Sequence, residues 1–256
     1  GLGPAHSRRP HWFLPLAGQL RGVYEAVHAH PDGDSTVARF AATAASVGYD
    51  GVVVRSDADA RPEYDRSEVV EEYGIDVVSG VELDAQTRSQ TSGALANLRD
   101  AATVLLVRGG TPDLNRFAAE SPRVDVLAGP MRGDGDVNHV VVKAADRNSV
   151  HLEFDFSRVL RASGGERVQA LRGLRKLREL VEHYDAPYVV TADPTSHLHV
   201  RAPRELLAVG DEIGFDRDQV EGGLEAWGDL AARNRERSSE EFIAPGVERG
   251  RYEEDP

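Results

Sequence analysis

Short, valine-rich apolar runs recur along the chain, and a turn and a segment with helical spacing follow most of them. The runs are Tyr24–His28, Gly51–Val54, Asp76–Val81, Thr103–Val107, Val124–Ala128, Val150–Phe154 and Tyr188–Thr191. Several are continuously apolar, which is typical of parallel strands buried on both faces. Because strands that alternate with helices pair in parallel through right-handed crossovers, this pattern constrains the chain to an α/β fold.

The segments between the runs have apolar residues at helical spacing. The predicted helices are Thr36–Val47, Pro112–Ala119, Val137–Arg147, Glu166–Tyr184, Pro203–Ile213 and Asp216–Arg237. For the first of them, Asp34 or Ser35 is placed to act as the N-cap, and Gly48 is placed to end the helix.

Seven strands over this length favour a distorted, TIM-like (β/α) barrel with parallel strands inside and helices outside. The alternative is an open, doubly wound sheet. A glycine-rich dinucleotide-binding loop after the first strand would favour that alternative, and the sequence has none there. The barrel is therefore the predicted fold.

The division of the chain follows from where this pattern begins and ends. Residues 1–22 contain three arginines, no acidic residue and no strand–helix pattern, so we expect a poorly structured extension that adds little stability. Val23 is a possible non-AUG start, which would place these residues outside the natural protein. Residues 23–237 are expected to form the barrel domain, and residues 238–256 a flexible, acidic tail.

The charge balance is unusual. The net charge is -13, and two of the 30 basic residues, Lys143 and Lys176, are lysines. Abundant acid with so little lysine predicts adaptation to high internal salt, where the Debye length of about 3 Å screens the global charge. The acidity therefore does not exclude a nucleic-acid partner. The sequence has no cysteine, no apolar run long enough to span a membrane and no convincing signal peptide, so we expect a cytoplasmic protein.

In a parallel barrel, functional side chains sit at the carboxyl ends of the strands. One interpretation of these positions is a divalent metal site. Its candidate ligands are His28, His30, Glu82, Asp193 and His197. The plainer alternative for the His-x-His pair is two surface histidines in a polar loop.

The other interpretation is a basic cluster that contacts phosphates through Arg55, Arg108, Arg132 and Lys143. Two of the arginines directly follow buried strands, which would place both guanidinium groups at one rim. The plainer alternative is that each is a solvated or ion-paired surface residue. Arginines beside a cation site would repel a metal, so a pocket that holds both sets favours anion binding. The basic residues of Glu166–Tyr184 are interspersed with glutamates and indicate a salt-bridged solvent face.

Several of these segments resemble one known family. They are Tyr24–Thr36 (YEAVHAHPDGDST), Gly48–Arg55 (GYDGVVVR), Ile75–Leu83 (IDVVSGVEL), Val104–Gly110 (VLLVRGG), Val137–Phe154 and Tyr188–Leu207. The chain is similar, from Val23 to about Arg237, to ribonuclease P protein component 3 of salt-loving archaea. That family is similar in fold to metal-dependent phosphoesterases of the polymerase-and-histidinol-phosphatase type, whose His-x-His and Gly-x-Glu are matched by His28–His30 and Gly80–Glu82.

The resemblance implies a protein subunit of the ribonucleoprotein that removes 5′ leaders from precursor tRNA. The RNA subunit would carry out the hydrolysis with magnesium, and this chain would bind no catalytic metal or other cofactor. Its implied partners are ribonuclease P RNA, precursor tRNA and a small companion protein. The later histidines of the phosphoesterase pattern do not align. The alternative functions are a metal-dependent phosphoesterase acting on a small phosphate ester, and a scaffold that binds protein alone.

Overall fold

The computed structural model describes residues 22–84, 87–99, 102–238, 242–244 and 247–248. Its main sheet consists of β1 (Tyr24–His28), β2 (Gly51–Asp57), β3 (Asp76–Leu83), β4 (Val104–Arg108), β5 (Val126–Ala128), β6 (His151–Asp155) and β7 (Tyr188–Thr191). Each strand pairs in parallel with the next one along the chain. All seven predicted strands are therefore confirmed.

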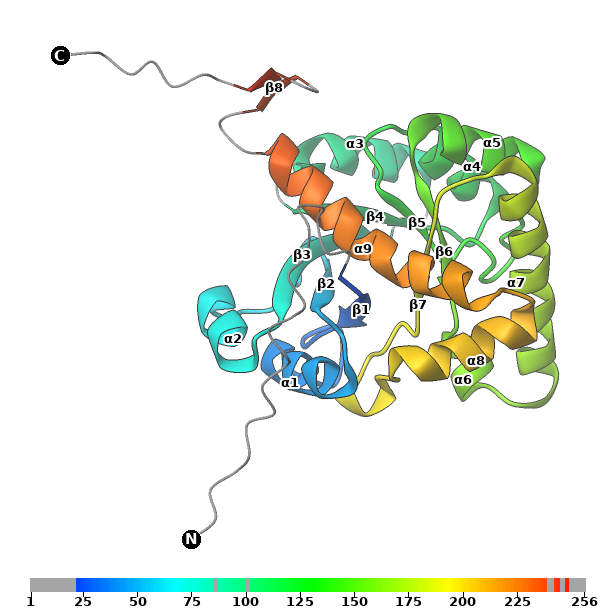
Figure 1. Ribbon diagram of the computed structural model, residues 1–256. Helices are drawn as coiled ribbons and strands as arrows, with labels where there is room; N and C mark the ends of the chain where they lie inside the picture. The colour runs from blue at the N-terminus through cyan, green and yellow to red at the C-terminus, as the bar shows by residue number, and fades with distance from the viewer. Residues whose placement is uncertain (1–21, 85–86, 100–101, 239–241, 245–246, 249–256) are drawn as a thin grey trace, which may run out of the picture.

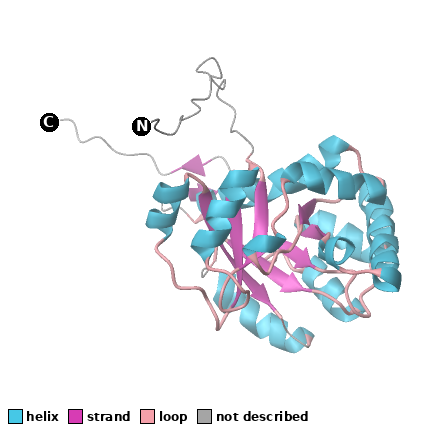
Figure 2. Cartoon of the chain, turned by 90° about the horizontal axis from the view of Figure 1, so that it is seen from below, coloured by secondary structure: helices cyan, strands magenta, loops and turns pink. Residues whose placement is uncertain are grey.

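The sheet curls into a nearly closed barrel (Figures 1 and 2). A doubly wound sheet would reverse its strand order part-way along, and this sheet runs from β1 to β7 without a reversal. The edge strands meet through irregular contacts: the Thr191 hydroxyl donates to the carbonyl of Ala26, and the His28 amide donates to the carbonyl of Pro194. The predicted barrel is confirmed, and its seam lies between β1 and β7.

Helices cover the outside of the barrel (Figure 2). They are α1 (Val37–Val47), α2 (Arg66–Tyr73), α3 (Arg88–Leu98), α4 (Pro112–Glu120), α5 (His139–Asn148), α6 (Ser157–Arg161), α7 (Gly164–Tyr184), α8 (Pro203–Ile213) and α9 (Arg217–Arg237), with a 3-10 turn, η2 (His197–His199), before α8. The predicted N-cap of α1 is wrong, because Thr36 accepts from the backbone of Arg39 while Ser35 is buried against His197. Gly48 ends α1 in the left-handed region, as predicted.

The core has two layers. Alternate strand residues point outward against the helices, and the residues between them, such as Ala26, Val53 and Val78, form a second apolar cluster inside the barrel. Trp227 of α9 belongs to this inner cluster and donates from Nε1 to the carbonyl of Val190. Farther along α9, Arg235 pairs with Asp76 at the start of β3, so α9 crosses the amino-terminal mouth of the barrel and closes it.

The two ends of the chain fall largely outside the described residues. The predicted extension at residues 1–22 is described at residue 22 alone. Within the predicted tail, β8 (Phe242–Ala244) and β9 (Val247–Glu248) form a short antiparallel pair. Among the described residues, no helix is long and apolar enough to cross a membrane.

Candidate functional site

The alternation of side chains along each strand brings polar groups into the carboxyl-terminal half of the barrel. Val53 of β2 and Val78 of β3 face the interior, so Arg55, two residues after Val53, and Glu82, four after Val78, face it as well. β6 contributes Glu153 in the same way, between the outward-facing Leu152 and Phe154. The interior is therefore apolar near α9 and polar at the opposite mouth.

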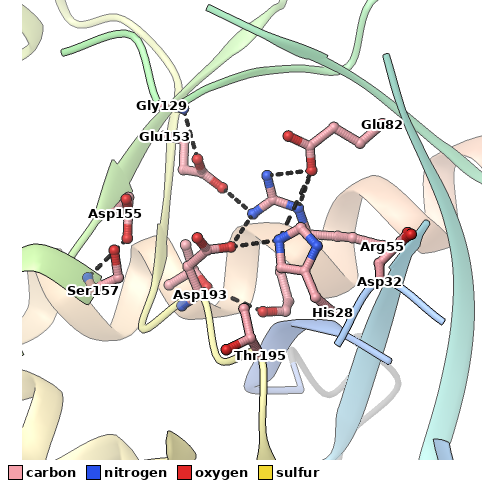
Figure 3. Close-up of polar contacts among 12 residues, drawn as sticks. His28, Asp32, Arg55, Glu82, Gly129, Glu153, Asp155, Ser157, Asp193 and Thr195 are labelled. Atoms are coloured by element: carbon pink, nitrogen blue, oxygen red, sulfur yellow. Dashed lines mark hydrogen bonds and ion pairs between the residues drawn. The ribbon is translucent and has the colours of Figure 1, made fainter. Parts of the chain in front are cut away.

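Arg55 lies at the centre of this polar layer, with its side chain 2% exposed (Figure 3). Its Nη2 is 2.7 Å from Oε2 of Glu82, and its Nη1 is 2.7 Å from Glu153 and 2.9 Å from Asp193. Burial acts to lower the pKa of the guanidinium, but the carboxylates outweigh it and raise the pKa above its ordinary value. Arg55 is thus an ionised group enclosed by three carboxylates.

These carboxyl groups titrate differently. Burial acts to raise the pKa of Glu82, but the charges of Arg55 and Arg108 outweigh it and lower the pKa to about 2. The pKa of Asp193 is also held well below its ordinary value, against burial, by Arg55 and the hydrogen bond from His28. Burial raises the pKa of Glu153 to about 7, because the attraction of Arg55 is opposed by the neighbouring aspartates. Glu153 therefore gains a proton first as the pH falls.

Two further arginines form an outer layer above Arg55. Arg108 donates from Nε to Glu82 across 2.7 Å, and Arg132 donates to Asp155 and Asp193. Their side chains are 33% and 34% exposed. Each has carboxylate partners already, so their positive charges are compensated within the barrel.

The predicted phosphate cluster is only partly brought together. Arg55, Arg108 and Arg132 share the polar layer, but the expectation that Arg55 sits exposed at a rim is wrong, because its strand register directs it into the barrel. Lys143 lies elsewhere: it is exposed on α5, and its ammonium is 4.9 Å from the ring centroid of Tyr184, at the end of α7. That end of α7 precedes β7, whereas the polar layer lies at the carboxyl ends of the strands.

The predicted metal ligands are also divided. His28 approaches Asp193 at 2.8 Å and Glu82 at 3.9 Å through Nε2. The strand ends at His28, so side-chain alternation does not extend to His30, which is exposed and faces another hollow. His197 contacts the hydroxyl of Ser35 instead. The described residues contain no group of three or more histidines and carboxylates arranged to hold a metal ion.

A cavity of about 330 Å³ opens above this layer at the carboxyl-terminal mouth. Its lining consists of His28, Asp32, Ser56, Asp57, Glu82, Asp84, Arg108, Arg132, Asp193 and Thr195. Carboxylates outnumber the arginines in it, and both arginines are ion-paired. Its balance is acidic, which repels phosphate, and it holds only parts of the two predicted sets, so the expectation of anion binding stays a prediction.

Sequence reasoning missed Glu153 and Asp155, which pair with Arg55 and Arg132. The signal was present in HLEFD (151–155), where carboxylates occupy alternate positions of a strand whose other residues are apolar. A buried strand of period two with acids on one face predicts a cationic partner inside the barrel.

Comparison with known proteins identifies the family. A family model described as RNase P subunit p30 matches residues 23–239. The chain belongs to this family. It is 63% identical to ribonuclease P protein component 3 of Halobacterium salinarum, over 91% of this chain and all of that protein. It is 60% identical to the Natronomonas pharaonis protein of the same name, over 88% and 94% of the two chains.

A solved structure supports the fold of this ribonuclease P subunit. A chain in a cryo-EM structure of archaeal ribonuclease P with mature tRNA superimposes with a TM-score of 0.76 at 21% identity. The match covers 91% of this chain and all of that chain. At this identity the likeness establishes the barrel, and the membership of the family rests on the sequence relatives.

Proposed function

We propose that this chain is a structural subunit of ribonuclease P. It binds the catalytic RNA and contributes no reacting group of its own. The placement of Arg55 supports this most. Its guanidinium lies between Glu82, Glu153 and Asp193, where those carboxylates would otherwise be free to bind a cation or exchange protons. Glu82 and Asp193, whose pKa values this arginine helps to hold low, are poorly suited to act as general acids or bases at neutral pH.

The reaction served is the removal of 5′ leaders from precursor tRNA, with magnesium bound by the RNA subunit. The relatives carry the name of ribonuclease P, and the archaeal complex that contains the superimposable chain was solved with mature tRNA. The proposed partners are ribonuclease P RNA, precursor tRNA and other protein subunits, among them a small companion protein. The barrel supplies a rigid body on whose surface these partners assemble.

A metal-dependent phosphoesterase remains the alternative function, and one observation favours it. His28, Glu82 and Asp193 do meet at one cavity of about 330 Å³, which is large enough for a small phosphate ester. The two functions differ in metal content. A phosphoesterase would retain one or more divalent ions per chain after purification and would hydrolyse a phosphate ester without any RNA.

Replacing His28 and His30 by alanine tests the structural role directly. We expect cleavage of precursor tRNA by the reconstituted complex to stay within about twofold of the parent, because neither imidazole supplies a reacting group. A melting curve serves as the control, since His28 has a hydrogen bond to the buried Asp193. Complete loss of cleavage in the folded variant, restored by added manganese, would overturn the proposal in favour of a metalloenzyme.

A further inference from the structure

Exposed and half-buried arginines of this chain differ in what their guanidinium groups contact. Many are neutralised by carboxylates, as in the i,i+4 pairs Arg116–Glu120 and Arg217–Glu221. Four others donate to main-chain carbonyls instead: Arg161, Arg167, Arg175 and Arg201. Arg161, at the end of α6, donates to the carbonyls of Ala192 and Asp193 at 3.0 and 2.8 Å. The described residues provide neither Arg161 nor Arg201 with an ion pair, although the charges of Asp155 and Asp193 act on Arg161 from farther away.

Arg201 is anchored in the same way beside η2. Its Nη1 donates to the carbonyls of Leu198 and Val200, at 3.2 and 3.1 Å. A guanidinium has five N–H donors, and these two bonds use the pair on Nη1, which leaves the fork formed by Nε and Nη2 for another group. That fork matches two oxygens of one phosphate.

His199 shows that the two arginines act on the same region. Its pKa is lowered by partial burial, and then by the positive charges of Arg161 and Arg201, with Asp34 acting in the opposite direction. Leu198, the preceding residue, is 72% exposed. Leu198, His199 and Arg201 lie between β7 and α8, whereas Arg161 reaches the start of this segment from the end of α6 (Figure 1).

We propose that Arg161, His199 and Arg201, together with the exposed Leu198, form a contact surface for the phosphate backbone of ribonuclease P RNA. We call these four residues the β7–α8 patch. The proposal rests on the proposed function. An arginine already paired with a carboxylate must give up that partner to bind phosphate, whereas the arginines of this patch need not. Their carbonyl anchors also hold the guanidinium groups in place, which matters in high salt, where counterion release contributes little.

A pair of double variants with equal charge change tests the patch. Arg161→Gln/Arg201→Gln removes the two carbonyl-anchored charges, and Arg116→Gln/Arg217→Gln removes two exposed charges that are already paired. Binding to the RNA is measured by fluorescence anisotropy across a potassium chloride series. We expect the first variant to bind about tenfold more weakly at the lowest salt, with a shallower salt slope, and the second to bind within about twofold of the parent.

A second comparison avoids removing any hydrogen bond that supports the fold. Leu198→Glu places a negative charge inside the patch, and Val140→Glu places one at another exposed apolar residue, on α5. We expect Leu198→Glu to weaken RNA binding and Val140→Glu to leave it unchanged. If the two variants of each matched set bound the RNA with equal affinity, while the parent chain still raised precursor-tRNA cleavage, the proposed patch would be wrong. A parent chain that neither bound the RNA nor raised cleavage would instead refute the proposed function.

Discussion

At the residue scale, Arg55 balances the charge of the carboxylates inside the barrel. A guanidinium that is 2% exposed is tolerated because three carboxylates surround it, and removing it would leave those carboxylates buried without a counter-charge. The barrel thus contains its own fixed cation. Its effect on stability can be measured separately from any role in the ribonucleoprotein.

Replacing Arg55 by methionine should lower the free energy of unfolding by about 3–5 kcal/mol at neutral pH, the usual cost of breaking a buried pair. The loss should shrink as the pH falls, because Glu82 and Asp193 would then regain ordinary or raised pKa values and be neutralised by protons. Urea denaturation at several pH values measures this. Arg217→Met is the exposed control, and an equal, small loss in both variants would contradict the account.

Glu25 is a further buried carboxyl, and no arginine among the described residues forms an ion pair with it. The hydroxyl of Tyr49 lies 3.1 Å from Oε2 of Glu25 and 3.0 Å from the carbonyl oxygen of Arg201. A phenol has one proton, so Tyr49 shares that proton between two acceptors, the Glu25 carboxyl and the Arg201 carbonyl. Burial raises the pKa of Glu25 to about 7 although these hydrogen bonds act to lower it, so we assign the folded carboxyl a proton below that pH.

This assignment predicts a pH-dependent stability. In the unfolded chain Glu25 loses its proton near its ordinary pKa of 4.5, and in the folded chain at about 7. Stability present below pH 4.5 is therefore lost as the pH rises to about 7, by about 3 kcal/mol for this group. Glu25→Gln cannot ionise, so its melting temperature should fall less between pH 5 and 8. Parallel curves for the two proteins would show that Glu25 is already ionised in the folded state.

At the scale of elements, α9 covers the amino-terminal mouth of the barrel. It begins beside β7, places Trp227 in the inner cluster and ends against the starts of β3 and β5. We expect Trp227→Ala to lower the unfolding free energy by about 3–5 kcal/mol, because it leaves a large void among apolar side chains. Trp227→Phe, which loses the hydrogen bond to Val190 but fills most of the space, should cost less. Equal costs in thermal melts would contradict this packing.

The strands were predictable because each is a short run of apolar residues buried on both faces. Helices without a strong apolar stripe were not: α2 buries Val69 alone, and its residues show little helical periodicity. The residues at the strand ends of the polar layer were predictable from the sequence, but their partners were not. The sequence identifies the strand ends, but the partners of Arg55 lie 27, 98 and 138 residues away, and only the barrel brings them together. The carbonyl contacts of Arg161 and Arg201 leave no pattern in the sequence.

At the scale of the whole molecule, the chain is an acidic barrel in which Arg55 pairs with three internal carboxylates, while Arg161 and Arg201 are held by main-chain carbonyls outside it. The net charge of -13 would repel RNA in dilute buffer, and screening in concentrated salt removes that obstacle. RNA contact then depends on a few positioned donors and on shape. The family membership favours assembly with a catalytic RNA over catalysis by the chain. The ion pairs between Arg55 and the carboxylates inside the barrel favour the same conclusion.

Reconstitution of precursor-tRNA cleavage, with and without this chain and over a range of magnesium concentrations, tests this account most directly. The other subunits are held constant, and the isolated chain is assayed beside the complex. We expect the chain to raise cleavage at limiting magnesium, to matter less when magnesium is abundant, and to cleave nothing alone. Cleavage of precursor tRNA or hydrolysis of a phosphate ester by the isolated chain, or a complex indifferent to its presence, would contradict the account.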